Sequence, residues 1–174
     1  KLDGLQLWLA LPESYEEIDP EFHHYDSMQI PAITINDVPV RILIGTAYNT
    51  ISPVKTFAKT LYIEANMKKG QSLELPDGVQ ERGLYIVRGK LKAKDSDLVE
   101  HSMTVFHPGQ SITVKAEEDT QLAVIGGEVL SHRHIWWNFV SSSKERIEQA
   151  KVDWMSGKFP KVPGDEVEFI PLPK

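Results

Sequence analysis

Short apolar segments separated by turn residues occupy most of the chain. The segments are rich in β-branched and aromatic side chains, and Gly, Pro, Asn and Asp separate them at intervals of about eight to twelve residues. The pattern predicts strands at residues 33–35, 38–44, 61–63, 84–91, 98–106, 111–114 and 122–125. Many short strands at this spacing predict an all-β fold, an antiparallel sandwich or barrel.

Two turns within this region have defined chemistry. Asn36-Asp37 separates two of the predicted strands, and both residue types tolerate the positive φ angles of a two-residue hairpin turn. The stretch 70–91 reads as a strand, a tight turn at Pro76-Asp77-Gly78, and a second strand that ends at Gly89.

The beginning of the chain has a different pattern. Residues 4–11 are apolar on both faces apart from Gln6, whereas a strand with one face in water would alternate. We therefore expect a leading strand that is buried on both sides or covers another element. Residues 12–31 are acidic and polar with three prolines, which predicts a long surface connection.

The end of the chain predicts one helix and an extended tail. Ser142 and Glu145 have capping-box spacing, and Gly157 suits the helix C-terminus, so we expect a helix of about fourteen residues. Ile147, Ala150 and Trp154 fall on one helical face. Four prolines favour an extended tail, with residues 167–170 as a docking strand.

These patterns suggest one domain in three parts. Residues 1–31 form the leading strand and connection, residues 32–140 the β-barrel, and residues 141–174 the helix and tail. With 174 residues the chain can bury a core without disulfides or metal.

Composition narrows the function classes. The absence of cysteine excludes disulfides, thiolate zinc sites and cysteine nucleophiles, and it fits a reducing compartment, so we expect a cytoplasmic protein. The net charge of −6 disfavours direct nucleic-acid binding, and no segment is apolar enough to predict membrane contact. The first residue is Lys1, from which we expect a piece of a longer protein.

Two groups of histidines are candidate metal ligands. His132 and His134 lie four to six residues before Asn138, and His134-x-x-x-Asn138 fits the end of a second cupin motif, although the turn expected before it lies far upstream, near Pro108-Gly109. A transition metal needs further donors, so the alternative is a hydrogen-bonded His134 beside packed tryptophans. His23 and His24 adjoin Glu21 and Asp26, but neighbours on an extended chain point apart, which favours a solvated pair.

Four other side chains could line a barrel cavity: Glu74, Glu81, Arg82 and Tyr85. A shift of one residue would move Glu81 from the interior to solvent, so spacing alone does not decide which residue faces inward. The alternative is a solvated Glu81-Arg82 surface. We find no Ser-His-Asp signature, no phosphate loop and no His-Glu-x-x-His, and we predict no catalytic residue.

The stretch from Gly70 to Gly89 resembles the first cupin motif: a glycine, a pair of metal-binding histidines, an acidic residue, and a closing glycine. Pro76 and Gly78 stand where the histidines belong, and neither has a metal-donor atom in its side chain. The stretch therefore has the strand-and-turn layout of the motif but lacks its metal-binding side chains.

Nearly the whole chain resembles the pirin family, specifically its C-terminal cupin. The segments that carry the resemblance are 4–8 with 11–12, 52–57 with 60–62, 81–87, 108–109, 126–128, 133–142, 145–150, 153–154 and 159–166. The most specific segment is Arg133-His134-Ile135-Trp136-Trp137-Asn138-Phe139-Val140-Ser141-Ser142, and its Trp-Trp-Asn-Phe form looks like the bacterial branch.

The resemblance implies two cupin barrels in one polypeptide. It also implies iron or another divalent metal held by three histidines and a glutamate in the N-terminal cupin, quercetin 2,3-dioxygenase activity in some members, and transcriptional co-regulation in others. All four ligands lie upstream of the matching region, so none is carried over to this chain.

We therefore predict an antiparallel β-barrel or jelly roll of the cupin class with one C-terminal helix and an extended tail. The leading hypothesis is a metal-free cupin half, without a cofactor of its own, that packs against the N-terminal cupin of the same protein and presents a surface to a protein partner. The alternatives are part of a quercetinase-like enzyme and a small-ligand-binding barrel without metal. An exposed former inter-domain face could also drive homodimerisation.

Overall fold

The computed structural model describes residues 4–174. By their contacts the described residues form two compact units. Residues 20–129 form one, called here the sheet unit; residues 4–19 and 130–174 form the other, called the terminal unit. The three-part division at residues 31 and 140 stays a prediction.

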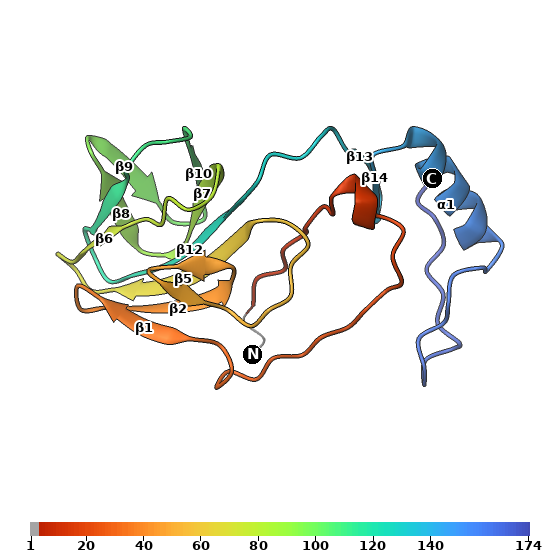
Figure 1. Cartoon of the computed structure of the whole chain (residues 1–174), viewed down its shortest axis with the longest axis horizontal. Helices are drawn as coiled ribbons and strands as arrows, with labels where there is room; N and C mark the ends of the chain where they lie inside the picture. The colour runs from red at the N-terminus through yellow and green to blue at the C-terminus, as the bar shows by residue number, and fades with distance from the viewer. Residues whose placement is uncertain (1–3) are drawn as a thin grey trace. The chain divides into compact units, whose positions relative to one another are not determined.

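The sheet unit contains two antiparallel sheets, which face each other in Figure 1. The larger sheet has the order β1-β2-β5-β12-β7-β10, with bounds Ala32–Ile35, Val38–Ile44, Thr60–Met67, Thr120–Gly127, Glu81–Arg88 and Met103–Phe106. The smaller sheet has the order β6-β11-β8-β9, with bounds Ser72–Glu74, Thr113–Ala116, Lys90–Ala93 and Ser96–Val99. A short hairpin joins β3 (Thr46–Ala47) to β4 (Thr50–Ile51). The predicted all-β fold class is confirmed: the unit is a jelly roll of two antiparallel sheets, although its strands do not close into one continuous barrel.

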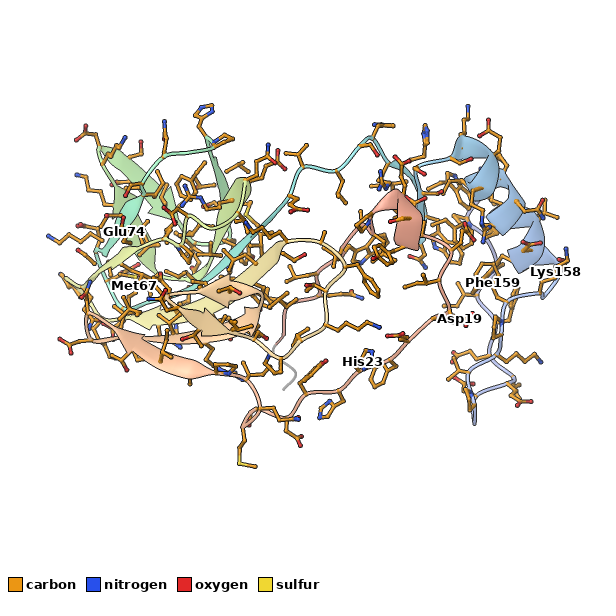
Figure 2. The ribbon with its side chains drawn as sticks, in the orientation of Figure 1. Asp19, His23, Met67, Glu74, Lys158 and Phe159 are labelled. Atoms are coloured by element: carbon orange, nitrogen blue, oxygen red, sulfur yellow. The ribbon has the colours of Figure 1, made fainter. Side chains whose placement is uncertain are left out.

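One hydrophobic core lies between the two sheets. Alternate residues of each strand point inward, such as Leu61, Ile63, Ala65 and Met67 of β5, and all four are at most 2% exposed. Figure 2 labels Met67 among the side chains of this core. Leu73, Leu91 and Val114 bring the smaller sheet into the same cluster. Burial of these side chains supplies the main driving force for folding of the unit.

The β1–β2 hairpin confirms the prediction from turn chemistry. Asn36 and Asp37 connect the two strands with φ angles of 48° and 65°. Positive φ at both central residues is the requirement of the turn type whose twist matches paired strands.

Two predicted strands are each broken into two. The segment 84–91 is divided at Gly89 between β7 and β8, and the segment 98–106 is divided into β9 and β10. In both cases the chain passes from one sheet to the other. Gly89 has φ of 97°, and a Cβ atom there would lie 2.6 Å from the carbonyl oxygen of Asp119, so the crossing requires glycine.

The prediction of a buried leading strand is wrong. Residues 4–11 form no strand, and Leu5, Leu7, Trp8 and Leu9 are between 41% and 60% exposed. A strand needs a neighbouring sheet edge for its backbone hydrogen bonds, and an apolar pattern does not supply one.

The terminal unit joins a 3-10 turn, a hairpin and a helix. The turn η1 spans Glu13–Tyr15, the hairpin consists of β13 (His134–Trp136) and β14 (Phe139–Ser141), and α1 spans Lys144–Met155. Ile147 and Ala150 are buried as predicted. No helix in the described residues is long and apolar enough to cross a membrane.

The helix begins one residue later than predicted. Ser143, and not Ser142, is the N-cap: its hydroxyl oxygen accepts a hydrogen bond from the Arg146 backbone N–H at 3.2 Å. Ser142 instead donates its hydroxyl to Glu16 at 2.8 Å. Two adjacent serines satisfy the same sequence signature, and a contact with a distant residue decides between them.

Replacing Ser143 by alanine is expected to lower the free energy of unfolding of the terminal unit by about 1 kcal/mol, because the first turn of α1 loses its cap. Urea denaturation followed by tryptophan fluorescence measures the change. Ser143→Thr, which keeps a capping hydroxyl, should lose less. An alanine variant as stable as the original protein would show that the cap contributes nothing.

The tail is held by aromatic contacts instead of a strand. No strand forms at residues 167–170, so that prediction is wrong. The indole N–H of Trp154 donates to the Ile170 carbonyl at 2.8 Å, and the ring stacks on Phe169 with centroids 5.8 Å apart. Trp154 also contacts Trp137 and Phe159, the latter labelled in Figure 2. Side-chain stacking therefore orders this proline-rich segment.

Candidate functional site

The turn at the cupin-motif position connects β6 of the smaller sheet to β7 of the larger one. Pro76 is buried and Gly78 is exposed. Neither offers a nitrogen, oxygen or sulfur atom in its side chain, and a metal site of the family type needs such donors. Pro76 and Gly78 therefore cannot bind a metal ion through their side chains at the positions where the motif has histidines.

A guanidinium group occupies the interior beside the turn. Arg82 is 3% exposed. Its Nη1 donates to the Pro76 carbonyl at 2.8 Å and to the Leu75 carbonyl at 3.5 Å. Its Nη2 donates to the carbonyl of Gln110, which lies in the loop between β10 and β11. One side chain thus connects two loops through three backbone acceptors.

Glu81 and Arg82 do not form a solvated pair. Side chains alternate along β7, so Arg82, Leu84 and Ile86 are buried in the interior while Glu81 is exposed. Within the described residues no ion pair of Arg82 with a carboxylate is found. The interior therefore contains a positive charge that neutral carbonyl groups alone solvate.

The other two candidate cavity residues lie elsewhere. Glu74 is exposed, accepts a hydrogen bond from the Ser111 hydroxyl at 2.6 Å, and is labelled in Figure 2. Tyr85 is half-buried on the face of β7 opposite Arg82, where it pairs with Met103 and Ala123 of the neighbouring strands. The structure does not bring Glu74, Glu81, Arg82 and Tyr85 together around one site.

A tyrosine next to Glu74 has a raised pKa. The hydroxyl of Tyr48 donates to the Glu74 carbonyl at 2.6 Å. Burial raises the pKa of Tyr48, and the negative charge of Glu74 raises it further. Tyr48 therefore stays neutral and acts as a hydrogen-bond donor that holds the end of β6.

His132 and His134 lie side by side in the terminal unit. Their rings meet edge to face with centroids 4.8 Å apart, because residues two apart on an extended segment share a face. His132 is exposed and His134 is half-buried. Among residues 4–174 no group of three or more histidine and acidic side chains is arranged to hold a metal ion.

His23 and His24 each contact a different acid. The Nε2 atom of His23 lies 2.8 Å from Glu21, and that of His24 lies 3.1 Å from Asp26. Both contacts are exposed, as expected for a solvated pair.

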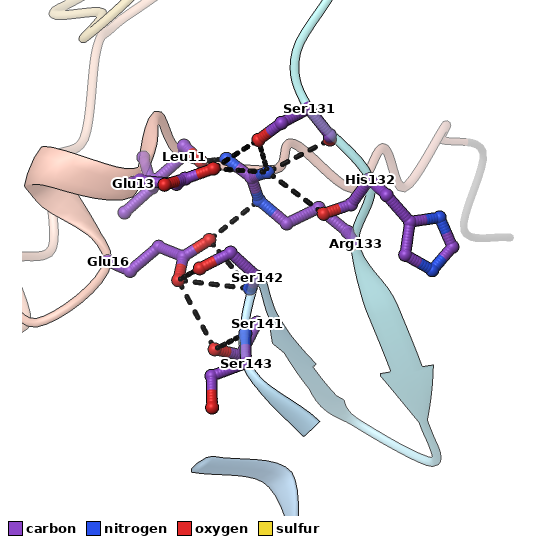
Figure 3. Close-up of polar contacts among 9 residues, drawn as sticks. All are labelled: Leu11, Glu13, Glu16, Ser131, His132, Arg133, Ser141, Ser142 and Ser143. Atoms are coloured by element: carbon purple, nitrogen blue, oxygen red, sulfur yellow. Dashed lines mark hydrogen bonds and ion pairs between the residues drawn. The ribbon is translucent and has the colours of Figure 1, made fainter. Parts of the chain in front are cut away.

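The main polar network of the terminal unit, shown in Figure 3, was not predicted from the sequence. The guanidinium of Arg133 is 8% exposed, and its Nε lies 2.6 Å from the carboxylate of Glu16 in an ion pair that is not a hydrogen bond. Arg133 also donates to the Leu11 carbonyl at 2.7 Å and to the Ser131 hydroxyl at 2.7 Å. Glu16 in turn accepts from the Ser142 backbone N–H at 3.0 Å. These hydrogen bonds and the ion pair connect residues 11–16 to the β13–β14 hairpin and to the start of α1.

These contacts lower the pKa of Glu16 below its ordinary value of 4.5. Burial alone would raise the pKa, but the hydrogen bonds from Ser142 and Ser141 and the charge of Arg133 outweigh it. A carboxylate with a lowered pKa in the folded state stabilises the fold above its unfolded pKa, and the contribution is lost as the pH falls through the folded value.

The terminal unit is therefore expected to lose stability as the pH falls below about 4.5, and Glu16→Gln should flatten this dependence. Urea denaturation by tryptophan fluorescence across the acid range measures it. Glu148→Gln is the control, because Glu148 lies exposed on α1 and forms an ion pair with the neighbouring Lys151. Equal pH profiles for Glu16→Gln and the original protein would contradict the assignment.

The chain is similar to known proteins of one family. The model of the pirin C-terminal cupin domain matches residues 62–160. A pirin-like protein of Caulobacter vibrioides is 40% identical over 175 residues, which cover 100% of this chain and 61% of that protein. A Pseudomonas aeruginosa protein named as a candidate quercetin 2,3-dioxygenase is 28% identical, over 91% of this chain and 57% of its own length.

A solved structure shares the fold. The crystal structure of a quercetin 2,3-dioxygenase from Acinetobacter baumannii superimposes with a TM-score of 0.85 at 23% identity, covering 96% of this chain and 57% of that one. The chain thus spans about 60% of the length of the curated relatives that it matches. With its two-sheet cupin architecture and a family match over more than half of its residues, this chain belongs to the pirin family and contains that family's C-terminal cupin domain.

Proposed function

We propose that this chain is the metal-free cupin half of a pirin-like protein, and that it packs against a metal-bearing half and completes the molecule. The observation that carries the proposal is the buried guanidinium of Arg82 beside the turn of Pro76 and Gly78. Pro76 and Gly78 stand where cupins of the metal-binding type place histidines, and the chain's own cation lies beside them, bonded to the Pro76 carbonyl.

The charge of Arg82 opposes a second cation. Two positive charges in a poorly solvated interior repel each other by several kcal/mol at separations of a few ångströms. The carbonyl oxygens that face the interior at this point are already bonded to the guanidinium. A metal ion would therefore find neither free donors nor a favourable potential there.

Exposed apolar side chains of the terminal unit support a packing role. Trp8 is 60% exposed in the leading segment, and Val167, Phe169 and Ile170 of the tail are between 60% and 97% exposed. Exposed apolar side chains that cluster often mark protein contacts. We infer that segments 4–9 and 167–170 include contacts with the metal-bearing half, which would correspond to the part of the Caulobacter relative that this chain does not match.

Association in trans tests this function. The N-terminal portion of the Caulobacter relative, up to its matching segment, is purified and mixed with this chain, and the complex is measured by light scattering after gel filtration. The proposal predicts a one-to-one complex. A Trp8→Ser/Phe169→Ser variant should weaken it, whereas a Val99→Ser variant, exposed on β9 of the sheet unit, should not. No complex with either the original chain or its variants would overturn the packing role.

A second candidate function is that this chain forms part of the cavity wall of a quercetinase-like enzyme. The Pseudomonas and Acinetobacter relatives are named for quercetin 2,3-dioxygenases, which favours this candidate over other enzyme classes. In that case the other half would hold the metal that supplies the dioxygenase chemistry, and this chain would supply no catalytic residue. Quercetin consumption by the complex in trans, and none by either part alone, distinguishes the enzyme from a purely structural assembly.

A further inference from the structure

The jelly roll has an open seam between its two sheets at strands β9 and β10. Strand β9 is the last strand of the smaller sheet and β10 the last of the larger sheet, and the two do not pair with each other. A pocket of about 220 Å³, called here the seam pocket, lies between them. This volume corresponds to about seven water molecules in the liquid, so it suits a ligand smaller than a typical drug.

The wall of the seam pocket is apolar at its base and polar at its rim. Leu98 and Ile112 are 7% and 6% exposed, and Phe106 is half-buried beside them. Thr104, Gln110 and Lys94 add a hydroxyl, an amide and an ammonium group. The lining contains one positively charged residue and no acidic one. The lining of this pocket is therefore positively charged, although the chain as a whole has a net charge of −6.

The buried cation of the sheet unit adjoins this pocket. Arg82 pairs with Phe106 across β7 and β10, and its Nη2 donates to the carbonyl of Gln110. Both Phe106 and Gln110 line the pocket. Because no carboxylate in the described part of the chain neutralises Arg82, its charge gives the pocket a positive potential that low solvation strengthens.

The rim lysine adds to this potential. Lys94 occupies the turn between β8 and β9 with φ of 50°, and no ion pair holds its ammonium group within residues 4–174. Asp97, the acid that faces Lys92 across the two strands, is already paired with Lys90 at 2.6 Å. The ammonium group of Lys94 is therefore available to a ligand.

We propose that the seam pocket binds a small organic anion with an apolar body and a single carboxylate. The apolar body contacts Leu98, Phe106 and Ile112, and the carboxylate lies toward Lys94 in the positive potential of Arg82. This inference does not depend on the proposed function, because it concerns the open edge of the jelly roll and not the metal-bearing half.

Titration of the chain with benzoate and with neutral benzamide, followed by amide NMR shifts, tests the proposal. We expect saturable shifts at residues 94–98, 104–106 and 110–113, with benzoate at least about tenfold tighter than benzamide, equivalent to about 1.4 kcal/mol. No saturable shift with benzoate up to about 10 mM would overturn the proposal, because even weak sites of about millimolar affinity would be detected. Equal affinities for the two probes would overturn the assignment of an anion.

Variants locate the site. Lys94→Met should weaken benzoate several-fold, and Thr104→Phe should abolish binding by filling the pocket. Lys92→Met is the matched control, because Lys92 is exposed on β8 and does not line the pocket. Circular dichroism verifies that each variant is folded. Unchanged benzoate affinity in a folded Thr104→Phe variant, or an equal loss in Lys92→Met and Lys94→Met, would contradict the location.

Discussion

Replacing Arg82 by methionine is expected to lower the free energy of unfolding of the sheet unit by about 3 kcal/mol or more. Methionine fills part of the space but donates no hydrogen bond. The carbonyls of Leu75, Pro76 and Gln110 then lose their donor, and each buried acceptor without a partner costs about 1–3 kcal/mol. The free energy of opening is measured from the slowest hydrogen-exchanging amides of β7 and β12, which report global unfolding of the unit.

The matched control lies on the same strand. Arg88 is exposed at the end of β7, so Arg88→Met should change the free energy of unfolding by less than about 0.5 kcal/mol. Arg82→Lys keeps the charge but not the planar arrangement of donors, and should fall between the two. An Arg82→Met variant as stable as Arg88→Met would show that the guanidinium does not hold the two loops together.

Replacing Arg133 by methionine is expected to have the second largest effect, about 2–4 kcal/mol, and only on the terminal unit. The change leaves the carboxylate of Glu16 nearly buried without its countercharge and removes the donors to Leu11 and Ser131. All four tryptophans of the sequence, at positions 8, 136, 137 and 154, belong to this unit. Urea denaturation followed by tryptophan fluorescence therefore reports this unit separately.

Arg146 supplies the control for this prediction. Its Nε lies 2.7 Å from Glu17, but both side chains are exposed, and exposed ion pairs contribute about 0–1 kcal/mol. Arg146→Met should therefore shift the transition much less than Arg133→Met. Equal shifts in the two variants would contradict the special role of the buried pair.

The sequence predicted local structure well where local chemistry decides it. Asn36-Asp37 specifies its hairpin turn because both residues accept positive φ angles. The face of α1 that contains Ile147 and Ala150 is buried because helical periodicity is a local property. The fold class followed from the same strand and turn signals.

The features that were not predicted from the sequence depend on residues far apart in the chain. Whether Arg82 points inward is decided by carbonyl groups of two loops, one of them 28 residues away, and the charged pair Glu81-Arg82 carries no local signal of burial. Arg133 and Glu16 are separated by more than one hundred residues, and the segment that carries the family resemblance around Arg133 does not indicate its ion-pair partner. The apolar segment 4–11 was interpreted as a strand because its hydrophobicity predicts burial. Hydrophobicity does not indicate whether a neighbouring strand is available to pair with the segment.

Metal content tests the central claim of a metal-free cupin most directly. The purified chain is loaded with ferrous iron without oxygen and desalted, and iron per chain is measured by mass spectrometry. The account predicts nearly no iron, both in the original chain and in a His132→Gln/His134→Gln variant. One iron per chain in both proteins would place a metal in the jelly roll and contradict the assignment of Pro76, Gly78 and Arg82, and iron lost only in the variant would place it at the histidine pair.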